Sequence, residues 1–225
     1  MNRHCRLQHR AMGWNGVLVT CLLFAAGCGM GGRSPADNRT FLLQIDPPAE
    51  GAGPPSVSIP LRIRSCRVAA PFAGRPLVYR LTAVQYQYDA YNAFLVPLGD
   101  QLDDALYRWL EAGSTAPPDQ ASYMLDPYLE SLVADFTDPN RPSASARIRF
   151  LLTRSGPDNS RPSVVFQKTL VAKVRMSAKP SADQVVAAFS ACIQHVLTQL
   201  RTTLAAMPGQ EAKKGDPRGL PLANE

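Results

Sequence analysis

The C-terminal part of the chain carries the pattern of one long amphipathic helix. Its apolar residues recur at helical spacing for about five turns, and they are Val185, Val186, Phe189, Cys192, Ile193, Val196, Leu197, Leu200 and Leu204. Ser181-Ala-Asp-Gln184 stands just before them and is typical of a capping box, in which side chains satisfy free backbone groups at a helix start. A stripe this broad is stable only against a second apolar layer, so the rest of the chain must supply one.

Segments with the two-residue period of β-strands are candidates for that layer. They occupy residues 40–45, 58–68, 77–81, 84–88, 128–136, 145–153 and 164–176. A second helix pattern follows Pro97, with an apolar stripe of Leu98, Leu102, Ala105, Leu106 and Trp109. Its acidic residues near the start suit the positive end of the helix dipole, and they are Asp100, Asp103 and Asp104. We therefore predict one α+β domain over residues 40–207.

Two of the strand segments show which side chains share a face. In residues 58–68 one face carries Ile59, Leu61, Ile63, Ser65 and Arg67, and the other carries Arg62, Arg64, Cys66 and Val68. In residues 145–153 the side chains of Ala146, Ile148, Phe150 and Leu152 face one way, and those of Arg147 and Arg149 face the other. This second pattern predicts a half-buried antiparallel strand with an exposed basic face.

The first 28 residues have the layout of an export signal. Arg3, Arg6 and Arg10 precede an apolar run over residues 17–26, and no acidic residue occurs before Asp37. A helix of that run rises only about 15 Å, too little to span a bilayer core of about 30 Å. Without the three leader arginines the formal net charge falls from +6 to +3, so a nucleic-acid partner is not expected.

The end of the leader resembles the lipobox of bacterial lipoproteins. The residues are Ala25, Ala26, Gly27 and Cys28, with small side chains before a cysteine. The resemblance implies cleavage after residue 27 and attachment of diacylglycerol, with a further acyl chain such as palmitate, to Cys28. The alternatives are an ordinary cleavable signal, or an uncleaved anchor, with an incidental cysteine. Because Gly29 replaces the Asp that favours inner-membrane retention, the expected location is the periplasmic face of the outer membrane.

The flanks of the domain have loop-like composition. Residues 28–39 are rich in Gly with Ser34, Pro35 and Asn38, and are predicted to form a tether. Residues 208–225 contain Gly and Pro and no aromatic residue, and are predicted to form a disordered tail. Processing would leave Cys66 and Cys192 as the only unmodified cysteines. They either form a disulfide or stay reduced and buried, and the sequence favours the second because nothing in it brings them together.

The sequence shows no catalytic constellation. Cys192 and His195 form a C-x-x-H half-site for zinc, but Cys66 is the only other soft donor. Nucleotide-binding loops and nucleophile elbows are absent, so we predict no enzyme activity, no metal and no cofactor beyond the lipid on Cys28. The aromatic residues Tyr79, Tyr86, Tyr88, Tyr91 and Phe94 are expected to fill a sheet face or an oligomer contact.

The segment from Leu77 to Leu110 carries a family resemblance. It holds a Tyr79-Arg80 pair, an aromatic strand over residues 86–96, Pro97 and a helix that includes Trp109. With the lipobox and an early strand ending at Asp46-Pro47, this resembles the ABC-type transport auxiliary lipoproteins, which accompany lipid transport systems containing MCE proteins. The resemblance covers about residues 40–204. Many members have Trp-Ala-Glu before the proline, where this chain has Asn92-Ala-Phe-Leu-Val96, which indicates a different branch.

The resemblance implies a fold and a function. The fold is a mixed, mostly antiparallel sheet with two main helices on one face, similar to the N-terminal domain of TolB. The function is that of a non-catalytic outer-membrane lipoprotein whose sheet edges or exposed aromatic residues contact an MCE assembly or identical subunits. From their exposed spacing, we hypothesise that Arg147 and Arg149 belong to such a contact. The alternative function is a periplasmic lipoprotein that binds and carries a lipid by itself.

Overall fold

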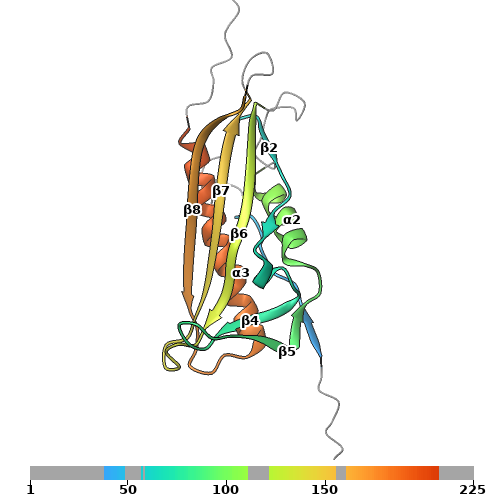
Figure 1. The fold of residues 1–225 in the computed structure, drawn as a ribbon, viewed down its shortest axis with the longest axis vertical. Helices are drawn as coiled ribbons and strands as arrows, with labels where there is room; N and C mark the ends of the chain where they lie inside the picture. The colour runs from blue at the N-terminus through green and yellow to red at the C-terminus, as the bar shows by residue number, and fades with distance from the viewer. Residues whose placement is uncertain (1–37, 49–56, 58, 111–121, 156–160, 208–225) are drawn as a thin grey trace, which may run out of the picture. The chain divides into compact units, whose positions relative to one another are not determined.

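Three long strands form the centre of one sheet: β6 (Tyr123–Asp135), β7 (Ser143–Arg154) and β8 (Ser163–Arg175). β7 is antiparallel to both β6 and β8 over nearly its whole length. Figure 1 shows them side by side, with β8 at the edge. This computed structural model describes residues 38–48, 57, 59–110, 122–155 and 161–207. The predicted signal peptide, Cys28 and the predicted tail lie outside the described residues.

Shorter strands complete the sheet on the other side of β6. β4 (Pro76–Arg80) and β5 (Tyr86–Phe94) form an antiparallel hairpin, and β1 (Arg39–Phe41) runs parallel to β5. β2 (Leu61–Ile63), β3 (Arg67–Val68) and the end of β4 each pair with β6 in parallel. The order β1-β5-β4-β6-β7-β8, with β2 and β3 beside β6, makes an eight-stranded mixed sheet. Because the long ladders are antiparallel and the parallel ones short, the predicted α+β class is confirmed.

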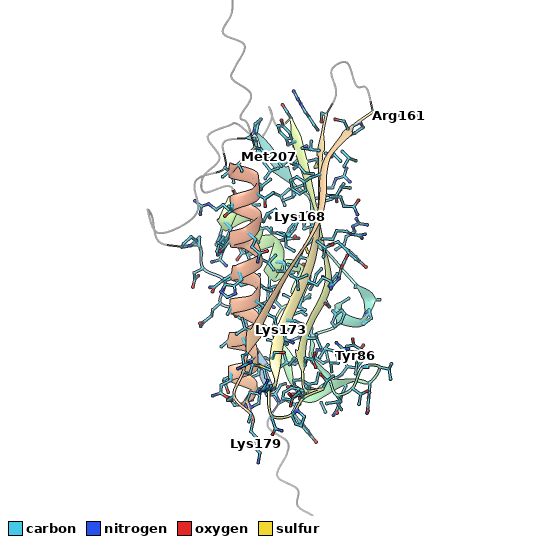
Figure 2. The ribbon with its side chains drawn as sticks, turned by 90° about the vertical axis from the view of Figure 1, so that its left-hand side faces the viewer. Tyr86, Arg161, Lys168, Lys173, Lys179 and Met207 are labelled. Atoms are coloured by element: carbon cyan, nitrogen blue, oxygen red, sulfur yellow. The ribbon has the colours of Figure 1, made fainter. Side chains whose placement is uncertain are left out.

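Two helices supply the apolar layer on one face of the sheet. α2 (Leu98–Leu110) follows Pro97, and α3 (Ala182–Ala205) begins after Ser181 with the predicted capping box, in which Gln184 N–H donates to the Ser181 hydroxyl. Both helices share one core with the inward side chains of the sheet, including Phe94, Phe150 and Phe189. Figure 2 shows α3 along one side of the strands and Tyr86 on the other side. We call the sheet face turned away from α3 the outer face.

The predicted strand over residues 58–68 is wrong as one continuous element. The structure has β2 and β3 instead, and it buries Cys66 where the alternation would bury Ser65. The register explains the break, because four steps from Ile63 to Arg67 pair with only three steps on β6. Pro127 lies at this point of β6 and has no N–H to continue the ladder. The Cys66 N–H instead donates to Asp103 Oδ1 of α2 at 2.5 Å.

The first predicted strand, residues 40–45, is also corrected. β1 starts at Arg39, inside the predicted tether, and ends at Phe41. The following backbone is held by side chains of the two helices: Leu43 N–H donates to Gln101 Oε1 at 2.8 Å and Gln44 N–H donates to Ser190 Oγ at 3.0 Å. Hydrogen bonds to helix side chains therefore replace strand-to-strand hydrogen bonds in this segment. Its apolar side chains enter the core although the segment is not a β-strand.

Candidate docking surface and charged hollow

The outer face of β7 and β8 is not covered by a helix in the described part of the chain. α3 packs against the opposite face, and the short 3-10 helix η2 (Ala70–Phe72) lies against β6 through a small apolar cluster of Phe72, Val78 and Val133. Beyond that cluster the side chains of the outer face are polar or partly exposed. Its cations are Arg62, Arg64, Arg67, Arg80, Arg147, Arg149, Lys173 and Arg175.

Three ion pairs account for the carboxylates of this face. Arg64 contacts Asp126 at 3.3 Å, Arg149 contacts Glu130 at 3.6 Å and Arg80 contacts Asp135 at 3.6 Å. Each pair is partly exposed, so it adds at most about 1 kcal/mol to stability. Among the described residues, the outer-face cations that form no ion pair with a carboxylate are Arg62, Arg67, Arg147, Lys173 and Arg175. The outer face therefore keeps an excess of positive charge.

The two arginines predicted to contact a partner both lie on the outer face, as the alternation indicates. Arg149 is half-buried, and its guanidinium lies 4.9 Å from the centre of the Tyr128 ring. Arg67 approaches the same ring at 5.7 Å. Arg147 is exposed between Ser131 of β6 and Val171 of β8. The strand thus presents one anchored and one unpaired arginine side by side.

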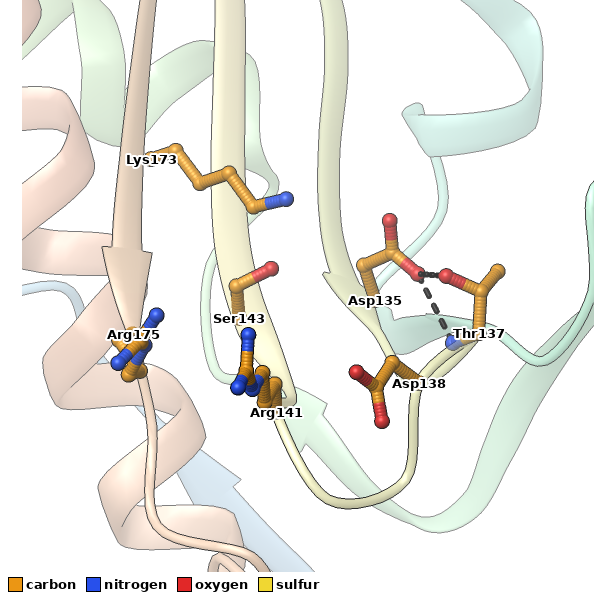
Figure 3. Close-up of a pocket in the computed structure, with 7 residues that line it drawn as sticks. All are labelled: Asp135, Thr137, Asp138, Arg141, Ser143, Lys173 and Arg175. Carbon is orange, nitrogen blue, oxygen red and sulfur yellow. Dashed lines mark hydrogen bonds between the residues drawn. The ribbon is translucent and has the colours of Figure 1, made fainter.

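A hollow of about 520 Å³ lies at one end of this face. β6 and the turn after it contribute Asp135, Thr137, Asp138 and Arg141, as Figure 3 shows. The remaining wall comes from Ser143, which begins β7, and from Lys173 and Arg175 at the end of β8. The register sets Ser143 directly opposite Arg175 and Ser145 opposite Lys173.

Asp135 is held in its charged form at the edge of this hollow. Its Oδ1 accepts hydrogen bonds from the Thr137 N–H at 3.0 Å and the Thr137 hydroxyl at 2.7 Å. Partial burial by itself would raise the pKa of Asp135, but these bonds and the charges of Arg80 and Lys173 outweigh burial and lower it. The carboxylate of Asp135 therefore binds Thr137 and Arg80. Arg141 and Arg175 form no ion pair with it or with another described carboxylate.

The aromatic hairpin divides into buried and exposed residues. The Tyr79 hydroxyl donates to Asp89 Oδ2 at 2.5 Å, and Phe94 is in the core. Burial, together with Asp89, raises the pKa of Tyr79. Burial would raise the pKa of Asp89 too, but hydrogen bonds from Tyr79, Tyr91 and Asn92 outweigh it and lower that pKa. Tyr86, Tyr88 and Tyr91 are each more than half exposed, so only part of the cluster fills a sheet face.

Cys66 and Cys192 are free and buried, and no disulfide joins them. Cys192 lies in the core on α3 with its thiol 3.4 Å from the Ala144 carbonyl oxygen, whereas Cys66 lies between β2 and β3. Burial raises the pKa of Cys66 to about 12 and that of Cys192 to about 11. The two residues of the C-x-x-H pair point to different surroundings, because His195 is exposed while Cys192 faces the core.

Neither a cluster of metal ligands nor a membrane-spanning helix occurs in the described part of the chain. Within it, no three or more His, Cys, Asp or Glu side chains gather closely enough to hold a metal ion. None of the described helices combines the length and the apolar character needed to cross a bilayer.

Comparison with known proteins gives a structural likeness. No family model matches the chain, and no curated protein matches it. Among solved structures, protein XCC0632 from Xanthomonas campestris, described as a member of the DUF330 family, has a TM-score of 0.60 at 22% identity, covering 74% of this chain and 94% of that one. This likeness concerns the fold, and it supports the mixed sheet with two helices.

Two further solved structures are less similar. One is an uncharacterised protein with a TM-score of 0.47 at 17% identity, covering 68% of this chain and 92% of its own. The other is the hypothetical protein CT253 from Chlamydia trachomatis, with a TM-score of 0.40 at 13% identity, covering 68% and 96%.

The charged hollow is not among the features that the sequence predicts. Its residues come from the turn after β6 and from the ends of β7 and β8, which lie far apart in the sequence. The available signal was the run Thr137-Asp-Pro-Asn-Arg141, a turn sequence that carries its own charges between two strand patterns.

Proposed function

We propose that this chain is a non-catalytic outer-membrane lipoprotein that serves as the auxiliary component of an MCE-type ABC system. Such a system moves lipids or other hydrophobic molecules across the periplasm. The lipid on Cys28 would hold the domain at the membrane, and the outer face would contact the MCE protein.

The observation that carries the proposal is the segment from β4 to α2. The Tyr79-Arg80 pair ends β4, the aromatic residues run along β5, and Pro97 stands directly before α2. These are the elements on which the family resemblance rests, in the same order. The hairpin also leaves Tyr86, Tyr88 and Tyr91 exposed, and exposed aromatic side chains are common at protein contacts.

The outer face supports a docking role. Within the described part of the chain, no helix covers it along β7 and β8, and Arg147 has no carboxylate partner there. Arginine is enriched at interfaces because its planar guanidinium pairs with carboxylates and stacks on aromatic rings. An acidic surface on the MCE protein would complement this charge.

Co-purification from the native host tests the proposal. The protein is captured from solubilised membranes, and the MCE-domain protein is quantified in wild type and in the double variant Arg147→Glu with Arg149→Glu. We expect the partner to be recovered with wild type and largely lost with the variant. The introduced glutamates would repel the acidic surface that the arginines attract.

The matched control is Lys168→Glu with Lys179→Glu, which changes charge equally at exposed residues that are not on the outer face. This control should retain the partner. Undiminished recovery with the double arginine variant would overturn the docking role of the outer face. Uptake of labelled phospholipid by the purified protein with no MCE partner in any capture would favour the carrier function instead.

A further inference from the structure

The hollow at the end of the outer face gathers hydrogen-bond donors that nothing in the described chain satisfies. Arg141, Lys173 and Arg175 line it and are exposed. None of the three forms an ion pair or a side-chain hydrogen bond with another described residue. The three like charges repel one another, and of the three only Lys173 interacts with the Asp135 carboxylate, without forming an ion pair, so a bound anion would relieve an unfavourable arrangement.

The two nearby carboxylates, Asp135 and Asp138, offset the charge of this group only in part. Asp135 is engaged by Thr137 and by Arg80. Asp138 accepts a hydrogen bond from the Asn140 N–H at 3.0 Å, which closes the turn. Figure 3 shows these two carboxylates on the β6 side of the hollow, with Lys173 and Arg175 on the β8 side. Positive charge is therefore concentrated along one wall.

Ser143 provides a second and independent observation. Its side chain lines the hollow between the two walls, and the residue is only 4% exposed. Its hydroxyl forms no hydrogen bond within the described residues. The hydroxyl oxygen is not one of the fully buried unpartnered atoms of the described residues, so it opens into the hollow. An acceptor oxygen bound in the hollow would receive a hydrogen bond from it.

We propose that this hollow binds a phosphate group. Guanidinium, ammonium and hydroxyl groups can all donate to phosphate oxygens, and charge-assisted bonds of this kind are the strongest that exposed side chains form. The volume of about 520 Å³ accommodates a phosphate with its substituents. The group can belong to a lipid headgroup or to free phosphate. The inference goes beyond the proposed function, because it does not depend on which protein contacts the outer face.

Calorimetric titration of the mature lipoprotein in a phosphate-free detergent tests this inference. The probes are inorganic phosphate and the soluble diester glycerophosphoglycerol, which carries the headgroup chemistry without acyl chains. We expect saturable binding of at least one probe at millimolar concentration. Stronger binding of the diester assigns the site to a lipid headgroup, and stronger binding of inorganic phosphate assigns it to the free ion.

Variants identify the hollow as the site. Lys173→Gln with Arg175→Gln should weaken binding about tenfold or more, since two charge-assisted bonds are lost. Ser143→Ala should weaken it about threefold to tenfold through loss of one donor. Lys168→Gln with Lys179→Gln removes the same charge elsewhere and should leave affinity unchanged. Absence of binding by both probes, or equal loss in the control variant, would overturn the proposal.

Discussion

The guanidinium of Arg149 lies 4.9 Å from the centre of the Tyr128 ring, on the face of the sheet opposite α3. The same guanidinium pairs with Glu130 at 3.6 Å. Its neighbour on the strand face, Arg147, has neither a ring nor a carboxylate partner within the described part of the chain. The two arginines thus differ in role: one is part of the fold, and the other is available for a partner.

This difference predicts unequal effects on stability. Arg149→Ala should lower the free energy of unfolding by about 0.5 to 1 kcal/mol, because it loses a partly exposed cation–π contact and an ion pair. Arg147→Ala should change it by less than about 0.5 kcal/mol. Urea unfolding of both variants measures this. A loss at residue 147 equal to that at residue 149 would contradict the assignment.

The bond from Tyr79 to Asp89 should make stability depend on pH. Tyr79→Phe should cost about 1 kcal/mol at neutral pH, a value reduced for the partial exposure of Asp89. Because the pKa of Asp89 is lower in the folded protein than in the unfolded chain, its stabilisation is present above about pH 4 and is lost as the pH falls through the folded pKa.

Unfolding of wild type and Tyr79→Phe across acidic pH tests this bond. The difference between them should shrink as the pH falls below about 4. Tyr86→Phe is the control, because Tyr86 is more than half exposed and its hydroxyl forms no hydrogen bond with another described residue. A difference that stays constant down to low pH would show that the carboxylate is not the partner.

Asp103 ties α2 to the gap between β2 and β3. Asp103→Ala removes the acceptor of the Cys66 N–H and should lower the free energy of unfolding by about 1 to 3 kcal/mol. Asp104→Ala, one residue on, removes only the exposed pair with Arg108 at 3.1 Å and should cost less than about 1 kcal/mol. Equal costs in denaturant unfolding would contradict the role of Asp103.

The buried thiols should be unreactive and should weaken the fold in alkali. At pH 8 iodoacetamide should modify Cys66 and Cys192 only after denaturation, because both are buried and their pKa values are raised to about 12 and about 11. The unfolded thiols lose protons near pH 8.5, so stability should fall as the pH rises above about 9. Mass spectrometry of the native protein with rapid labelling at either cysteine would contradict the burial.

Local signals predicted much of the fold. The Ser181 capping box, the stripe of α3 and the helix after Pro97 are all present, because each depends on residues close in sequence. The predicted alternation of buried and outward side chains around Arg147 is also present. β7 is paired on both sides, and burial of one face fixes which side chains point inward. Signals of this kind need no knowledge of what lies across the core.

Long-range pairing explains what the sequence did not predict. The break at Cys66 depends on Pro127 in another strand and on Asp103 in a helix. The shortening of β1 depends on Gln101 and Ser190, which take over its backbone hydrogen bonds. The hollow requires the ends of three strands to meet, so its residues show no pattern in the linear sequence.

Site-specific photo-crosslinking in the native host tests the docking account most directly. A photoreactive amino acid is introduced in place of Arg147 on the outer face or in place of the exposed Gln199 on α3. The account predicts a crosslink to the MCE-domain protein from residue 147 and none from residue 199. A crosslink from residue 199 alone, or from neither residue while both proteins are present in the membrane, would contradict it.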